Sequence, residues 1–90
     1  MIDNKKINNV LIQDKISSLL FKTAAVKGNI PIALANYALC LKNGRGVGLN
    51  DNEACEYYYK AMLAGNFESR EDLDKLLPHA EGFKKKHRDY

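Results

Sequence analysis

The sequence predicts an all-α fold, a short solenoid of about four to five helices arranged as α/α-hairpins. Three observations lead to this prediction. Apolar residues recur at three- and four-residue spacing along several segments, which is typical of amphipathic helices. The chain repeats a pattern after 37 residues, a period within the range of helical solenoids. The chain has only two Pro, so few positions interrupt a helix, and the absence of Trp also suits a helical chain.

Composition excludes several classes of protein. The 90 residues are 46% hydrophobic and 28% charged, which suits one small globular domain rather than a disordered chain. No apolar run approaches the roughly 20 residues of a membrane span, and no apolar block of a secretory signal follows the N-terminal charges. We therefore expect a cytoplasmic protein, with delivery into a host cell left open. The net charge of +3 is too mild to imply nucleic-acid binding by itself.

The internal repeat relates residues 23–29 to residues 60–66. At the same offset, Asp14 corresponds to Asp51. Each copy consists of an acidic N-cap, an apolar stripe, a group of small residues and a Gly-Asn pair that stops the helix. The first predicted helix therefore spans residues 14–27, with Asp14 as its N-cap and Gly28 in the left-handed conformation after its end.

The next predicted helix begins at Pro31, which suits a first helical turn, and ends at Asn43-Gly44. It carries two apolar stripes, so we expect it to be buried on two sides. The glycine-rich residues 44–48 that follow are predicted to form a tight turn between two helices, with positive φ angles and with Val47 plugging the hairpin. A phosphate-binding loop is the alternative, but no strand precedes the glycines and no Lys-Ser/Thr follows them.

A further helix is predicted to start at Asn50 or Asp51 and to stop at Gly65-Asn66. One more short helix falls within residues 67–77, and Pro78 closes it. The ends of the chain are less regular. Residues 1–12 have apolar residues at helical spacing, which allows a degenerate helix, and we expect the polar, basic segment to fray beyond Phe83.

The hairpin at residues 30–66 resembles a Sel-one-like repeat, a relative of the tetratricopeptide repeat. The residues that match the structural motif of that repeat are Ala33, Gly44, Gly46, Val47, Ala54, Tyr57, Tyr58, Ala61 and Gly65. The chain departs from the motif at Tyr37-Ala38, where the family has Leu-Gly, and at Leu41, where the family has Tyr. Ala38 replaces the glycine that lets two helices approach closely, so we expect slightly wider helix spacing.

The resemblance implies a tetratricopeptide-like, right-handed stack of hairpins. We expect one helical-repeat domain over residues 1–78, followed by a basic tail over residues 79–90. The domain would comprise a partial repeat at 1–29, the full Sel-one-like repeat at 30–66 and a C-terminal capping helix at 67–78. Proteins of this family are protein–protein adaptors and seldom enzymes, so the resemblance implies a non-catalytic interaction module.

The resemblance also places the partner surface on the first helix of the hairpin, at Ile32, Asn36, Leu39 and Asn43. Tyr59 is added as an exposed contact, because Tyr57 and Tyr58 are explained as core positions. The alternative is that Ile32 and Leu39 pack against the N-terminal helix.

A single repeat cannot bury its own stacking faces. Either the segments at 1–12 and 67–77 cap it, or another chain completes the stack, as a homodimer or as a protein partner. A sharper form of the hypothesis is a small inhibitor or immunity-type protein that blocks a target enzyme.

No catalytic, metal or cofactor site is expected from the remaining polar residues. Cys40 and Cys55 form either a disulfide or, in a reducing cytosol, two half-buried thiols. His79 and His87 lack the spacing of metal ligands and are expected to be solvated. An acidic cluster is explained by the preference of carboxylates for a helix start; it comprises Glu68, Glu71, Asp72 and Asp74.

The basic tail supplies the alternative function. It contains Lys84, Lys85, Lys86 and Arg88. These residues either bind nucleic acid or another anionic surface, with steep salt dependence, or only make the C-terminal segment soluble.

Overall fold

The computed structural model describes the backbone of residues 4–88 and the side chains of residues 12–88. This part of the chain is all-helical, as predicted, with five α-helices and one short 3-10 turn. They are α1 (Asn4–Gly28), α2 (Pro31–Asn43), α3 (Asp51–Leu63), α4 (Ser69–Leu76), η1 (Leu77–His79) and α5 (Glu81–Lys86). No helix within residues 4–88 is long and apolar enough to cross a membrane.

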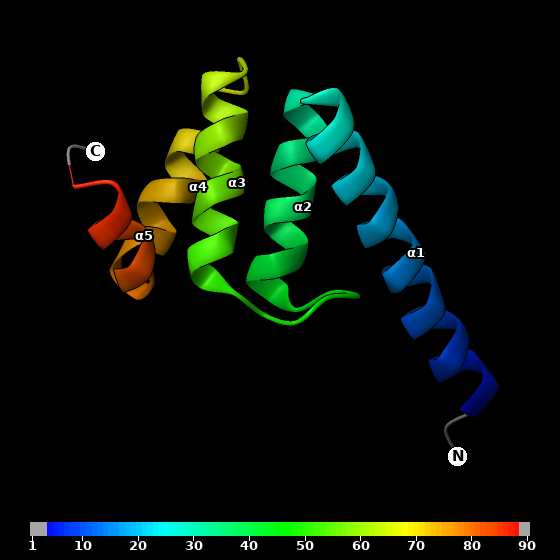
Figure 1. Ribbon diagram of the computed structural model, residues 1–90. Coiled ribbons are helices and arrows are strands. Elements are labelled where there is room, and N and C mark those ends of the chain that lie inside the picture. The colour runs from blue at the N-terminus through cyan, green and yellow to red at the C-terminus, as the bar shows by residue number, and fades with distance from the viewer. Residues whose placement is uncertain (1–3, 89–90) are drawn as a thin grey trace.

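The first four helices run alternately up and down beside one another (Figure 1). The antiparallel pair α2 and α3 lies at the centre, with α1 packed on α2, and with α4 and α5 packed on α3. The N-terminal half of α1 extends past the hairpin, so the molecule is long in one direction, with dimensions of 50 × 27 × 19 Å. Right-handed solenoid stacking stays a prediction.

The core is centred on the contact between α2 and α3. The rings of Tyr37 and Tyr57 meet edge to face, with centroids 4.8 Å apart. This geometry is favoured between aromatic rings. Small residues bring the two helices together, because Ala38, Ala54 and Ala61 are fully buried. The apolar stripe of α3 and one stripe of α2 are therefore confirmed as core. The expectation that α2 is buried on two sides is wrong, because on its second stripe Ala35 is only partly buried and Leu39 is 40% exposed.

Most of the predicted helix ends are confirmed. Pro31 lies in the first turn of α2, and Gly44 ends that helix in the left-handed region with φ 68°. The N-cap of α3 is Asn50, whose side-chain oxygen accepts a hydrogen bond from the backbone N–H of Glu53 at 3.0 Å. These ends are encoded by the local sequence, since each needs only one residue with the right backbone or side-chain chemistry.

Two expectations for the first helix are wrong. Asp14 is not an N-cap, because α1 runs without interruption from Asn4 and Asp14 lies inside it. Residues 4–13 contain neither Gly nor Pro, so nothing stops the helix from propagating through them. The left-handed residue after α1 is Asn29, with φ 49°, and not Gly28. Asn tolerates this region better than other residues with side chains.

The glycine-rich loop holds α1 against the hairpin. Gly46 has φ 72°, and a Cβ at this position would overlap the backbone carbonyl of Asp14 in α1. The Ser18 hydroxyl donates a hydrogen bond to the Gly46 carbonyl at 3.3 Å, and Arg45 forms an ion pair with Asp14 at 3.5 Å. Val47 packs against the core, as predicted. The glycines therefore serve the turn and the close approach to α1.

The expectation that the chain frays beyond Phe83 is wrong for residues 84–86, because they belong to a helix. Residues 81–86 form α5, in which Phe83 is only 1% exposed, and the adjacent Ala80 is fully buried. These two residues lie three positions apart and pack on the same side, so they anchor the short helix. The Asn52 side chain on α3 accepts a hydrogen bond from the Phe83 backbone N–H at 3.1 Å.

We predict that Gly46→Ala lowers the free energy of unfolding by more than about 2 kcal/mol. The left-handed conformation alone costs an alanine about 1–2 kcal/mol, and the overlap with α1 adds to this. The matched control is Gly48→Ala, where a Cβ has open space and φ is not positive. We expect that variant to stay within about 0.5 kcal/mol of the wild type. Urea unfolding followed by circular dichroism measures both, and equal effects would contradict the assigned contact.

Candidate protein-binding groove

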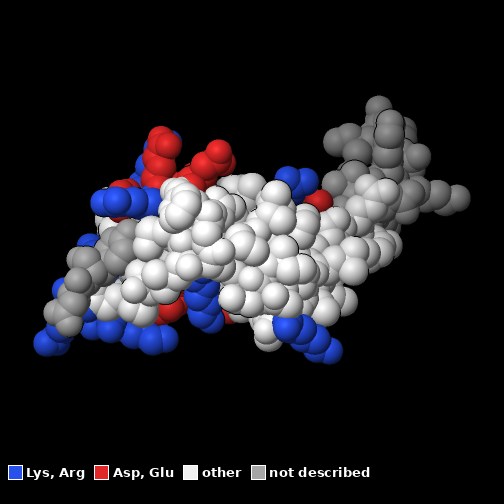
Figure 2. Space-filling model, turned by 90° about the horizontal axis from the view of Figure 1, so that it is seen from above, with Lys and Arg blue, Asp and Glu red and all other residues white. Residues whose placement is uncertain are grey.

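A groove of about 320 Å³ lies between α2 and α4, over α3. It is lined by Ile32, Ala35, Asn36, Leu39, Tyr58, Asn66, Glu68, Ser69 and Asp72. Seen from above, most charged side chains gather on the side of the C-terminal helices, and a broad uncharged surface extends from there toward α1 (Figure 2). The lining of the groove itself combines apolar side chains of α2 with the carboxylates of Glu68 and Asp72.

The α2 wall of the groove is apolar and accessible. Ile32 is 65% exposed and Leu39 is 40% exposed, with Asn36 between them. The structure thus brings together three of the five residues that the sequence analysis assigned to partner binding. The alternative, in which Ile32 and Leu39 pack against the N-terminal helix, is wrong for Ile32. Leu39 lines a second groove of about 310 Å³, between α1 and α2, together with Phe21.

The other two assigned residues lie elsewhere. Asn43, the last residue of α2, is exposed and does not line either groove. Tyr59 is half-buried beneath α5, with its ring centroid 6.1 Å from that of Phe83 and 5.2 Å from that of His87. The prediction that Tyr57 and Tyr58 are core residues is confirmed. The prediction that Tyr59 is an exposed contact is wrong, because its ring lies against residues of the C-terminal segment of its own chain.

The α4 wall of the groove is acidic. Glu68 and Asp72 line it, whereas Glu71 and Asp74 line a separate depression beside Phe67. The predicted acidic helix start is confirmed, since Glu71 and Asp72 lie in the first turn of α4. Carboxylates are favourable there because the backbone N–H groups of a helix start carry partial positive charge. This local preference also gives the groove its negative side.

The floor of the groove is formed by nearly buried polar residues. Burial, together with the nearby charge of Asp72, raises the pKa of Tyr58 to about 12. The Tyr58 phenol therefore stays neutral across the physiological range. Ser69 is only 1% exposed, and its hydroxyl has no hydrogen-bond partner among the described residues. The groove thus combines apolar, neutral polar and negatively charged surface.

The two cysteines are free and buried rather than bridged. Burial raises the pKa of Cys55 to about 11, with the nearby Asp51 and Glu56 adding to the effect, and burial also raises the pKa of Cys40. Both thiols are therefore protonated at neutral pH, which is the opposite of the activation that a nucleophilic cysteine needs. Within the described residues, no group of three His, Cys, Asp or Glu side chains could hold a metal ion.

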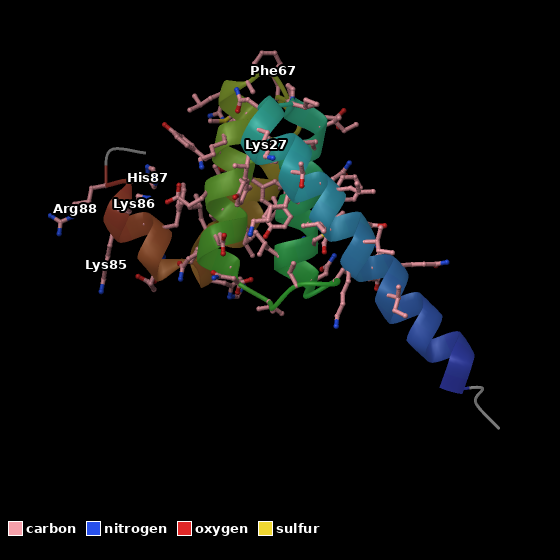
Figure 3. The ribbon with its side chains drawn as sticks, turned by 45° about the vertical axis from the view of Figure 1, so that its right-hand side comes forward. Lys27, Phe67, Lys85, Lys86, His87 and Arg88 are labelled. Carbon is pink, nitrogen blue, oxygen red and sulfur yellow. The ribbon has the colours of Figure 1, made fainter. Side chains whose placement is uncertain are left out.

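The basic residues of the C-terminal segment are divided between ion pairs and solvent. Lys84 lies 2.8 Å from Glu81, and Lys86 lies 3.3 Å from Glu56. Lys85 and Arg88 point away from the body of the molecule (Figure 3). The basic residues therefore do not form one continuous positive face.

His87 is not the solvated residue that the sequence predicted. Its Nε2 lies 2.9 Å from the Glu56 carboxylate, and its ring lies against Phe83, with centroids 4.4 Å apart. The folding of α5 onto α3 brings His87 to the half-buried Glu56. The exposure of His79 is as expected.

Glu56 is the residue that sequence reasoning missed. Burial alone would raise the pKa of its carboxyl, but hydrogen bonds from His87 and Lys86, and the charges of both residues, bring the pKa below its ordinary value. Glu56 and His87 are 31 residues apart in the sequence. No local pattern signals such a pair, because it depends on where α5 docks.

Comparison with known proteins gives no match. No family model fits the sequence, and no curated protein or solved structure is significantly similar to the chain. The resemblance to Sel-one-like repeats stays a prediction, so a function has to be inferred mainly from the geometry of the groove.

We predict that neither cysteine reacts readily with a thiol reagent in the folded protein, because the raised pKa values keep both thiols protonated and burial keeps them covered. In urea, both should react at the rate of a free thiol. Counting modified thiols by mass spectrometry during the reaction tests this. Rapid modification of either thiol in native buffer would contradict the burial shown.

We also predict a pH-dependent contribution from Glu56. Because the folded-state pKa lies below the ordinary value of 4.5, the stabilisation is present above that pH and is lost as the pH falls through the folded-state pKa. Glu56→Gln should therefore lower the free energy of unfolding by about 1–2 kcal/mol at pH 7, with a smaller effect at pH 3. Urea unfolding at several pH values measures this.

The control for this prediction is Glu71→Gln. The ion pair of Glu71 with Lys75 is highly exposed on both sides, so we expect almost no change in stability at any pH. If Glu56→Gln and Glu71→Gln behaved alike, the contacts from α5 to Glu56 would not stabilise the fold.

Proposed function

We propose that this protein is a non-catalytic protein-interaction module that holds a short segment of a partner protein in the groove between α2 and α4. The observation that carries the proposal is the pairing, in one groove, of exposed apolar side chains on α2 with the carboxylates of Asp72 on α4 and of Glu68, the residue before that helix. Such a groove suits a segment that presents an apolar side chain beside a basic one. Apolar burial would supply affinity, and the charges would select the partner.

The Sel-one-like motif supports the same proposal, because its relatives are adaptors built from stacked helical hairpins. A small inhibitor or immunity-type protein is the sharper form of this function, with the bound segment belonging to a target enzyme. A homodimer is the other form that a protein partner could take. The proposal includes a cytoplasmic location, which the two free cysteines support, since a reducing compartment keeps thiols reduced.

Binding of nucleic acid or another anionic surface through α5 is the alternative. The outward-pointing Lys85 and Arg88 favour it. The ion pairs of Lys84 and Lys86 with glutamates weaken it, because these lysines are already partly neutralised. The groove therefore has the stronger support.

We predict that Ile32→Asp weakens partner binding at least tenfold. The substitution places a charge on the apolar wall, but Ile32 is exposed in the first turn of α2, where an acidic residue does not disturb the helix. The matched control is Leu49→Asp, at an equally exposed residue outside the groove. Affinity capture with the full chain, quantified by mass spectrometry, should show partners that are retained by the wild type and the control and lost with Ile32→Asp.

A third variant distinguishes the groove proposal from binding of nucleic acid or another anionic surface through α5. Lys85→Glu combined with Arg88→Glu should leave these partners bound, and binding should persist at high salt. If instead binding followed this variant and fell steeply with salt, the electrostatic alternative would replace the groove proposal.

A further inference from the structure

The outward face of α1 carries a second exposed apolar surface, separate from the groove. Its five large side chains are each more than half exposed, and they are Ile12, Ile16, Leu19, Leu20 and Val26. An apolar patch of more than a few hundred Å² is uncommon on a monomeric protein and marks an interaction site. The five side chains lie on one face of one helix, so they form a single patch rather than scattered exposed residues.

The opposite face of the same helix is already occupied. Ser18 and Ala25 are buried, and Phe21 is partly buried against the core. The inward and outward sets are interleaved along α1, so they lie on opposite sides of the helix. α1 therefore has two contact faces, of which the fold uses one.

The spacing of the outward residues indicates the shape of a partner. Ile12, Ile16, Leu19 and Val26 follow intervals of four, three and seven residues, and Thr23 completes the alternation of fours and threes. This is the spacing of the a and d positions in a coiled coil, where the seam of one helix packs against the seam of another. The face therefore fits an α-helix.

The charges beside this seam indicate the chemistry of that helix. Lys15 and Lys22 lie along one edge of it, and Lys27 lies near its C-terminal end (Figure 3). The only acidic residue between positions 12 and 28 is Asp14, which forms an ion pair with Arg45. The flanks of the outward face are therefore positively charged.

A second copy of this chain does not suit the face. If two α1 helices packed through this seam in antiparallel fashion, Lys15 of one copy would lie near Lys22 of the other. In a parallel pair, Lys22 of one copy would lie near Lys27 of the other. Like charges in flanking positions disfavour a coiled-coil pairing, and opposite charges favour it.

We propose that the outward face of α1 binds an amphipathic helix of a partner protein in which acidic residues flank the apolar seam. This surface lies outside the groove of the proposed function, so the two can be tested separately.

The test uses the full chain and two synthetic helical peptides with Leu at the a and d positions. One peptide has Glu at the flanking e and g positions, and the other has Lys. Fluorescence anisotropy of the labelled peptides should show binding at least tenfold tighter for the Glu peptide. Leu19→Gln should weaken its binding at least tenfold, whereas Leu49→Gln, at an equally exposed leucine elsewhere, should not.

Charge reversal tests selectivity. Lys15→Glu with Lys22→Glu should invert the preference, so that the Lys peptide binds more tightly. Lys85→Glu with Arg88→Glu changes the net charge equally but away from α1, and it should leave the preference unchanged. Equal binding of both peptides, or binding insensitive to Leu19→Gln, would overturn the proposal.

Two further measurements test whether a second copy binds at α1 and whether the α1 face acts independently of the groove. Light scattering should show the same oligomeric state for the wild type and for Leu19→Gln, and a dimer that Leu19→Gln dissociates would overturn the proposal in favour of a second copy. Ile32→Asp should leave peptide binding unchanged, so a failure of the groove proposal is distinguishable from a failure at α1.

Discussion

The rest of the structure depends on the contact between α2 and α3. The edge-to-face packing of Tyr37 and Tyr57 and the buried alanines beside it fix these two helices as one antiparallel unit. Every other helix packs on one side of this unit, α1 on α2 and the C-terminal helices on α3. Because each outer helix has a neighbour on one side only, its other side must be polar, capped or bound to another molecule.

The two ends of the molecule meet this constraint differently. At the C-terminal end, the short α5 covers part of α3 with the buried Phe83, and the Glu56 carboxylate receives contacts from His87 and Lys86. At the N-terminal end, α1 buries one face on α2 and leaves large apolar side chains on the other. The short α5 thus covers part of α3, whereas the outward face of α1 stays uncovered, and binding there would remove that apolar surface from water.

Much of the fold follows from the sequence, because most of it is encoded locally. The helical spacing, the proline at the start of α2 and the glycine after it each specify a feature of the backbone. The features that the sequence analysis missed depend on tertiary contacts or on the lack of a helix-breaking residue. α1 continues past Asp14 because nothing interrupts it, and α5 forms because Ala80 and Phe83 find a place on α3. For the groove, sequence reasoning found the α2 wall, but not its pairing with Glu68 and Asp72.

The groove and the outward face of α1 differ in both shape and charge. The groove, at about 320 Å³, accommodates a few side chains but not a helix of about 10 Å diameter, and its α4 wall is acidic. The α1 face is a straight seam with lysines beside it, suited to a whole helix. A ligand segment matched to one surface is therefore mismatched to the other in shape and in charge. Two such surfaces on one small chain would hold two different segments at the same time, which is the physical requirement for joining one protein to another.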